Sequence, residues 1–212
     1  MKGKSMQIDI VPAGLLQANS YLLTKDNKNA VLIDCGGAEV LKFAESKGLK
    51  VGAVLLTHGH FDHIGGCAEA QEAGAKIGCS KEDAKILSSN ENLSGMTGVP
   101  MKKFNADFTF QDGDTLSFFG MDFKVISTPG HTRGSVSFLF EDCLFTGDTL
   151  FYGSAGRTDF PGGDENELFS SLKKLSLIEG DLKVYPGHDK ATSLDRERKY
   201  NPYVRLAMSR EE

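Results

Sequence analysis

The sequence lacks tryptophan and has no pair of cysteines at the C-x-x-C spacing. Its four cysteines, Cys35, Cys67, Cys79 and Cys143, are scattered along 212 residues. Scattered cysteines in a chain of this length are typical of small buried apolar residues in a reducing compartment. We therefore expect no disulfide framework.

Long apolar runs and long runs of one charge are also missing. No apolar run approaches the roughly 20 residues of a membrane span. Residues 1–7 carry charge, but the short apolar segment after them is broken by Asp9 and Pro12, which is not typical of a signal peptide. The 24 basic and 29 acidic residues give a net charge of −5 without a basic stripe. We expect a cytoplasmic protein with neither a membrane nor nucleic acid among its partners.

Short apolar segments of strand and helix length account for most of the chain. No linker or low-complexity stretch divides them, so we predict one domain over residues 1–212. Strands are expected over residues 7–11, 20–24, 30–34, 51–57, 76–79, 108–110, 116–119, 122–126, 136–140, 143–146 and 183–185. Two strand-rich halves, each with helices, predict an α/β fold in which two sheets pack face to face with helices outside.

Polar and glycine-rich segments separate these elements. The turn at 25–29 makes its flanking strands a hairpin. Helices are expected after Gly37, at 65–73, at 164–177, at 194–200 and after Pro202. Ser80–Asp83 resembles a capped helix start, and 88–105 is predicted to be a surface loop.

The strongest chemical signal is the segment Thr57-His58-Gly59-His60-Phe61-Asp62-His63, at the end of an apolar strand. On extended backbone, His58 and His60 project to the same side because they lie two residues apart. The adjacent Asp62 and His63 project differently and can serve a second point in space. Four potential ligands within six residues predict a site for two metal ions.

The remaining two of the five histidines each follow a Pro-Gly dipeptide. His131 follows Pro129-Gly130 and His188 follows Pro186-Gly187, both where a short strand gives way to a tight turn. Asp148, in the segment 145–149, ends another apolar run. A Gly-Asp pair alone is usually a turn, but beside histidines from other strand ends Asp148 becomes a candidate bridging ligand.

The order of these residues resembles the metallo-β-lactamase superfamily. The resemblance covers nearly the whole chain and implies an αββα sandwich of two mixed sheets with the metals at one edge. It implies His58, His60 and His131 as ligands of one ion, Asp62, His63 and His188 as ligands of the other, and Asp148 as the bridge. Nitrogen and oxygen ligands favour Zn²⁺, and Fe and Mn are compatible with them.

Within the superfamily the chain is similar to the glyoxalase II group, of the short hydroxyacylglutathione hydrolase type. The segments that carry this likeness are 147–151, 156–164 and 185–188, with Glu197 and Asn201-Pro202 downstream. The likeness implies hydrolysis of a small-molecule thioester, S-lactoylglutathione or a related acyl-glutathione, by a hydroxide between the metals that Asp62 orients. The chain ends before the basic C-terminal region that holds glutathione in typical members.

Several residues near these motifs have two interpretations. Arg157 either reaches a substrate carboxylate or forms an ion pair with Asp159 or Asp164. Asp34 either orients a ligand histidine or caps a helix. Asn19 and Tyr21 match the family's opening pattern without an assigned role. Four aromatic residues are expected in the core rather than in the pocket: Phe61, Phe151, Tyr152 and Phe160.

Other functions are compatible with parts of the pattern. An iron-dependent persulfide dioxygenase would need one iron, which His58, His131 and Asp148 could hold. A lactonase or phosphodiesterase of the same superfamily is a second alternative. A β-lactamase is less favoured, because Asp148 stands where a zinc-binding cysteine would be needed. A non-enzymatic metal-binding module would require a closed coordination sphere. The acyl group, the thiol carrier and the oligomeric state are not indicated by the sequence.

Overall fold

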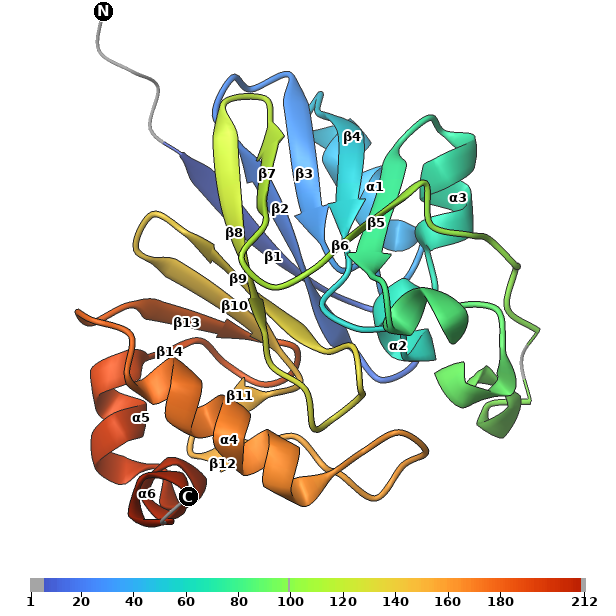
Figure 1. Cartoon of the computed structure of the whole chain (residues 1–212). Helices are drawn as coiled ribbons and strands as arrows, with labels where there is room; N and C mark the ends of the chain where they lie inside the picture. The colour runs from blue at the N-terminus through green and yellow to red at the C-terminus, as the bar shows by residue number, and fades with distance from the viewer. Residues whose placement is uncertain (1–5, 99, 211–212) are drawn as a thin grey trace, which may run out of the picture.

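Two six-stranded mixed β-sheets face each other in this computed structural model, which describes residues 6–98 and 100–210 (Figure 1). Residues 1–5 lie outside the described part. They form most of the segment that was predicted not to be a signal peptide. The first sheet consists of β1 (Gln7–Ala13), β2 (Ala18–Thr24), β3 (Asn29–Ile33), β4 (Lys50–Leu55), β5 (Lys76–Ser80) and β6 (Phe108–Phe110), in that order. Its first three strands are antiparallel, and β3 to β6 are parallel.

The second sheet has the order β14-β13-β10-β9-β8-β7. Its strands are β7 (Thr115–Phe118), β8 (Met121–Ser127), β9 (Val136–Phe140), β10 (Cys143–Gly147), β13 (Lys183–Pro186) and β14 (Thr192–Ser193). Neighbouring strands are antiparallel except β10 and β13, which are parallel. A small hairpin, β11 (Leu150–Phe151) with β12 (Ser154–Ala155), leaves this sheet after β10.

Helices cover the outer face of each sheet, so the predicted αββα sandwich is confirmed (Figure 1). The first sheet carries α1 (Glu39–Ser46), α2 (Phe61–Ile64) and α3 (Cys67–Glu72). The second carries α4 (Glu165–Ser176), α5 (Leu194–Tyr200) and α6 (Pro202–Ser209). Within residues 6–98 and 100–210, no helix combines the length and the apolar character needed to cross a membrane.

Alternation along the central strands explains the three apolar layers of the molecule. Val54 packs beneath the helices of the first sheet, whereas its neighbour Leu55 lies between the sheets. In β10, Leu144 packs toward α4 and Phe145 lies between the sheets. Successive strand residues point to opposite faces, and here both faces are buried, so these strands are apolar throughout.

The helix predicted at about 65–73 is present as α3 and begins two residues later, but the short helix α2 before it was not predicted. The structure has two short helices, α2 and α3, separated by Gly65 and Gly66. A Cβ on Gly65 would lie 2.5 Å from the carbonyl oxygen of Gly36, and one on Gly66 would lie 2.6 Å from the backbone of Gly37. The chain therefore bends where two glycine pairs pack backbone against backbone, a long-range contact that local periodicity does not reveal.

Other boundaries differ in smaller ways. The predicted hairpin around 25–29 is present as β2 and β3, and α5 begins and ends as predicted. The region 88–105 contains two 3₁₀ turns, Asn90–Asn92 and Ser94–Met96, rather than a plain loop. The β11–β12 hairpin and β14 were not predicted, because two-residue strands carry too little pattern.

The C-terminal helices are joined to the body by a buried carboxylate. Glu197 is fully buried and accepts hydrogen bonds from the backbone of Gly153 (2.8 Å), the Thr192 hydroxyl (2.6 Å), the Arg196 guanidinium (2.6 Å) and the Asn201 amide (2.9 Å). Buried donors that lose their acceptor each cost about 1–3 kcal/mol.

We therefore expect Glu197→Ala to lower the free energy of unfolding by about 2–4 kcal/mol, because at least two of these donors stay buried without a partner. Urea denaturation measures this change. Glu45→Ala, on the exposed face of α1, is the control and should stay within about 0.5 kcal/mol of wild type. Equal stabilities of the two variants would contradict the role assigned to Glu197.

Candidate metal centre

The seven predicted site residues come together at the edge where strands of both sheets end. The segment 57–63 follows β4, and His131, Asp148 and His188 follow β8, β10 and β13. The last three strands point the same way, because β9 is antiparallel to both of its neighbours and β13 is parallel to β10. Their carboxyl ends therefore meet at one edge of the second sheet.

Three histidines form the first group of this centre. His58, His60 and His131 each offer a ring nitrogen, and these nitrogens lie within 4.8 Å of one another. His60 Nδ1 is 2.8 Å from His131 Nε2. Their rings stand nearly perpendicular to one another and pack edge to face.

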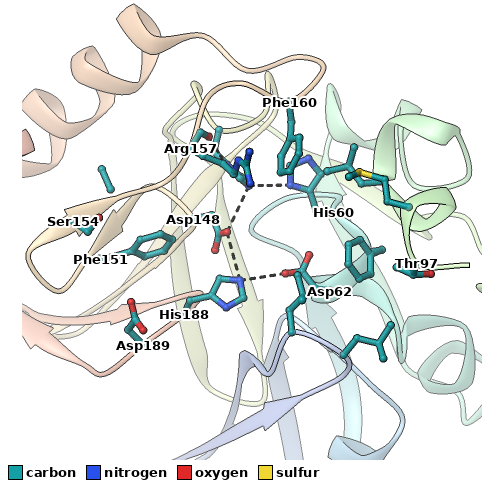
Figure 2. A pocket seen from close by; sticks show the side chains of 17 residues that line it. His60, Asp62, Thr97, Asp148, Phe151, Ser154, Arg157, Phe160, His188 and Asp189 are labelled. Atoms are coloured by element: carbon teal, nitrogen blue, oxygen red, sulfur yellow. Dashed lines mark hydrogen bonds and ion pairs between the residues drawn. The ribbon is translucent and has the colours of Figure 1, made fainter. Parts of the chain in front are cut away.

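The second group consists of Asp62, His63 and His188. Asp62 Oδ2 lies 3.2 Å from His188 Nε2 and 3.7 Å from His63 Nε2. Figure 2 shows Asp62 and His188 turned toward each other across the floor of a cavity. His63 is fully buried and His188 is the most exposed of the seven, so this group opens toward the cavity.

Asp148 lies between the two groups (Figure 2). Its carboxylate is 3.5 Å from His131 Nε2 of the first group, and 3.3 Å and 3.6 Å from the Nε2 atoms of His63 and His188 in the second. Gly187 allows this approach, because a Cβ there would lie 2.1 Å from Asp148 Oδ1. The predicted bridging position is thus where the carboxylate is found.

Several polar atoms in this centre are buried without a hydrogen-bond partner among the described residues. They include His58 Nε2, His63 Nε2 and Asp148 Oδ1. Buried polar side-chain atoms are nearly always hydrogen-bonded, so a cluster of exceptions needs an explanation. All three belong to the converging set, and nitrogen and oxygen atoms are the donors that bind Zn²⁺ and Fe. The donor set therefore fits metal ions.

Burial and neighbouring charges act differently on the two groups of the centre. Burial lowers the pKa of His60 to about 3 and holds the pKa of His58 well below its usual value, so both rings are neutral and able to act as ligands. Burial alone would raise the pKa of Asp148, but His63 and the other rings more than offset it and hold it below its usual range. Burial opposes protonation of His63, yet the neighbouring carboxylates raise its pKa. The carboxylates thus favour positive charge beside them in the second group.

Asp34 orients ligand-bearing residues and does not cap a helix. Its Oδ2 accepts hydrogen bonds from His63 Nδ1 (2.8 Å) and from the Thr57 hydroxyl (2.7 Å), and the same hydroxyl lies 3.1 Å from His58 Nδ1. The capping alternative is wrong, since α1 begins after Ala38 without a side-chain cap. Asp34 could itself be grouped with His58 and His63 as a ligand, but it faces Nδ1 of His63, the nitrogen turned away from Asp148.

The loops that carry His131 and His188 are held by hydrogen bonds between side chains and backbone carbonyls. His131 Nδ1 donates to the carbonyl oxygen of Arg157 at 2.7 Å. The Arg157 side chain forms a two-pronged ion pair with Asp159, with both distances 2.6 Å, so that alternative is confirmed. Asn19 and Tyr21 both donate to the carbonyl oxygen of Pro186, two residues before His188. Their role is to hold this loop, a contact across more than 160 residues that sequence reasoning missed.

A cavity of about 680 Å³ opens directly above the centre (Figure 2). Phe61, Phe151 and Phe160 line it, so the expectation that they belong to the core is wrong. Phe160 packs edge-on against His60, and Phe151 packs edge-on against His188. Tyr152 does not line the cavity; its ring lies under the Arg196 and Lys190 side chains, so the core expectation is wrong for it as well.

We expect Asp34→Ala to weaken Zn²⁺ binding about 10- to 100-fold, because His63 loses the acceptor that fixes its orientation. Zinc retained per chain during dialysis against graded chelator concentrations measures the loss. Asp26→Ala is the matched control, since Asp26 likewise accepts several hydrogen bonds but lies in a distant turn between β2 and β3. Equal zinc retention by the two variants would disprove an orienting role for Asp34.

Comparison with known proteins agrees with this geometry. The family model described as the metallo-beta-lactamase superfamily matches residues 13–188. The chain is 36% identical over 208 residues to hydroxyacylglutathione hydrolase GloC of Haemophilus influenzae, covering 94% of this chain and 98% of that one. Among solved structures, it is similar to BLEG-1 B3 metallo-beta-lactamase, with a TM-score of 0.88, 35% identity and coverage of 93% and 99%. It is also similar to TTHA1623 in a di-iron-bound form, with a TM-score of 0.82, 35% identity and coverage of 92% and 99%.

These likenesses extend over nearly the full length of each relative, so they concern the whole sandwich and not a shared motif alone. Members of the superfamily bind metal ions, and the converging donors described above match that property. The chain belongs to the metallo-beta-lactamase superfamily and is a metallo-hydrolase of that family.

Proposed function

We propose that this chain is a cytoplasmic thioester hydrolase, formed as one domain over residues 1–212, with a binuclear metal centre. Its substrate is S-lactoylglutathione or a related acyl-glutathione. The observation that carries the proposal is the position of Asp148, within 3.6 Å of donors from both ligand groups. The hydroxyacylglutathione hydrolase among its relatives supports the choice of thioester substrate.

The donor geometry supports two ions rather than one. His58, His60 and His131 would hold the first, Asp62, His63 and His188 the second, and Asp148 would bridge them. Imidazoles and carboxylates around such a pair suit Zn²⁺, and the same donors suit Fe and Mn. The di-iron form of a relative at 35% identity keeps iron as an alternative to zinc.

The residues of the centre have defined tasks in such a reaction. When bound, paired divalent ions lower the pKa of a shared water from about 16 toward 7 and polarise a carbonyl oxygen. Asp62 lies on the cavity floor, where its carboxylate can hold and orient that nucleophile. Phe151 and Phe160 restrict the access of bulk water. The leaving thiol has a pKa of about 8.5, so no strong general acid is required beside it.

The rival activities make different demands on the same residues. A persulfide dioxygenase would need a single iron with open positions, which leaves Asp62, His63 and His188 without a role. Lactonase and phosphodiesterase activities use the same pair of ions and differ only in the cavity. A second candidate is β-lactam hydrolysis, because the chain is similar at 35% identity to a structure titled as a B3 metallo-beta-lactamase.

We expect the purified protein to hydrolyse S-lactoylglutathione with two bound metal ions per chain. Asp148→Ala should lower kcat by at least about 100-fold, because a shared ligand is lost and the reacting groups are displaced. Elemental analysis, circular dichroism and the thioester assay on the same samples separate loss of metal, loss of fold and loss of activity. Full activity after exhaustive metal removal would disprove the mechanism.

The same samples distinguish the rivals. The panel contains a lactone, a phosphodiester and a chromogenic β-lactam beside the thioester, with oxygen consumption measured on glutathione persulfide. Oxygen uptake together with one iron per chain would contradict the proposed thioester hydrolysis and support the persulfide dioxygenase instead. Turnover of the β-lactam at a higher kcat/KM than the thioester would favour the second candidate.

A further inference from the structure

The mouth of the cavity above the metal centre exposes large apolar side chains. Leu15, Leu16 and Met96 line it and are 65%, 57% and 71% exposed. Leu15 and Leu16 belong to the β1–β2 turn, and Met96 comes from the 3₁₀ turn at residues 94–96. Exposed apolar side chains gathered around one cavity are a mark of a ligand-binding groove.

The same cavity offers little positive charge. Arg157 is the one arginine or lysine among the described residues that line it, and the three histidines of the lining belong to the metal centre on its floor. Both prongs of its guanidinium are engaged by Asp159, and the group lies 4.0 Å from the centre of the Phe160 ring. The carboxylate of Asp189 adds negative charge to the lining. Anionic parts of a ligand are thus poorly matched by this mouth.

We propose that the apolar mouth formed by Leu15, Leu16 and Met96 binds the acyl group of the thioester and favours acyl chains of several carbons. The proposal rests on thioester hydrolysis at the centre below. The thiol part of a common carrier bears carboxylates or phosphates, which this mouth does not neutralise. The acyl group is therefore the part of the substrate whose binding is favoured by burying the apolar surface of these side chains.

A series of acyl-glutathiones with one thiol and acyl chains of two, four, six and eight carbons tests this subsite. We expect kcat/KM to rise about three- to ten-fold for each added pair of methylenes. Leu16→Ser should flatten this rise and leave the metal content unchanged. Leu177→Ser is the matched control, since Leu177 is 63% exposed but does not line the cavity, and it should keep the wild-type rise.

The outcomes separate this subsite from the proposed function. Hydrolysis that does not depend on chain length, or a rise that Leu16→Ser leaves intact, overturns the subsite and leaves the thioesterase. If no compound of the series is hydrolysed, the proposed thioester hydrolysis is overturned. The compounds then remain intact during a binding measurement, and their Kd values test the subsite. A Kd that is independent of chain length in that case overturns the subsite as well.

A second feature, independent of the cavity mouth, is the buried carboxylate of Asp83. It is 2% exposed and starts the 3₁₀ turn Asp83–Lys85, where a capped helix was predicted. Its Oδ2 accepts hydrogen bonds from the backbone of Gly59 and from the Thr132 hydroxyl, both at 2.8 Å. Its Oδ1 accepts from the backbone of Gly134 at 2.9 Å.

These three donors belong to the two loops that carry the first ligand group. Gly59 lies between His58 and His60, and Thr132 follows His131 directly. The first loop comes from β4 of one sheet and the second from β8 of the other. Asp83 thus ties together loops that no strand pairing connects, and it does so without contacting the second ligand group among the bonds described.

We infer that Asp83 is a positioning residue for the first metal ion alone. Without its carboxylate, the loops of His58–His60 and His131 lose their common acceptor and shift relative to each other. An outer contact of this kind typically changes metal affinity 10- to 100-fold. Asn in its place keeps the size, but its amide nitrogen donates and cannot accept. Either Gly134 or the pair Gly59 and Thr132 therefore loses its acceptor.

The test counts zinc retained by the holoprotein during dialysis against graded chelator concentrations. Two backgrounds isolate the two groups: His188→Ala leaves the first group complete, and His58→Ala leaves the second complete. We expect Asp83→Asn to weaken zinc retention 10- to 100-fold in the His188→Ala background and to have no effect in the His58→Ala background. Asp83→Ala is a second variant with the same expected pattern.

Asp107→Ala is the control, because Asp107 likewise accepts three hydrogen bonds, here from one backbone amide and two side chains, but lies before β6, away from the centre. It should leave zinc retention unchanged in both backgrounds. Equal losses in the two backgrounds would show a general structural role for Asp83, and no loss in either would show that the loops are held by other contacts. Either result overturns the inference, whether or not any thioester is hydrolysed.

Discussion

The fold of this molecule has to hold several carboxylates and imidazoles close together in the buried centre at the edge of the two sheets. Two carboxylates and five imidazoles meet within a few ångströms, and His60 Nδ1 and His131 Nε2 are only 2.8 Å apart. Leaving buried nitrogen and oxygen atoms without a partner is expensive, so such a cluster favours bound metal ions and needs a rigid frame to maintain it. Binding of metal ions and stability of the frame are therefore coupled.

The two-sheet sandwich supplies that frame. Strands whose side chains are buried on both faces of the sheet have little freedom to tilt. The positions of their ends relative to one another are therefore fixed. The parallel relation of β8, β10 and β13 brings three of the candidate ligands to one edge, and β4 brings the other four from the facing sheet. Buried polar contacts then set the remaining degrees of freedom: Asp34 turns His63, the Arg157 carbonyl turns His131, and the donors Asn19 and Tyr21 fix the approach to His188.

The sequence predicted what depends on local pattern and on the order of motifs. The apolar runs of β4 and β10, with the polar residues that end them, are enough to place the ligands at strand ends. Two strand-rich halves with helices predicted the packed sheets, and the resemblance that the motif order carries implied the same αββα sandwich. What depends on distant partners was not predictable: Gly65 and Gly66 break a helix because of Gly36 and Gly37, and Tyr21 contacts a carbonyl 165 residues away. Asp83 had the pattern of a helix start, and only its burial between two loops shows otherwise.

The two ends of the cavity are under different physical constraints. On its floor, several of the candidate donors are held by contacts with other elements, so substitutions there are expected to alter metal binding and the chemistry. At its mouth, Leu15, Leu16 and Met96 protrude from turns, and their side chains are mostly exposed. Residues of this kind can change without disturbing the core, because little free energy depends on their packing. A fold of this design can keep one reaction while its substrates diverge, so the acyl preference must be sought in the turns and the reaction class in the strand ends.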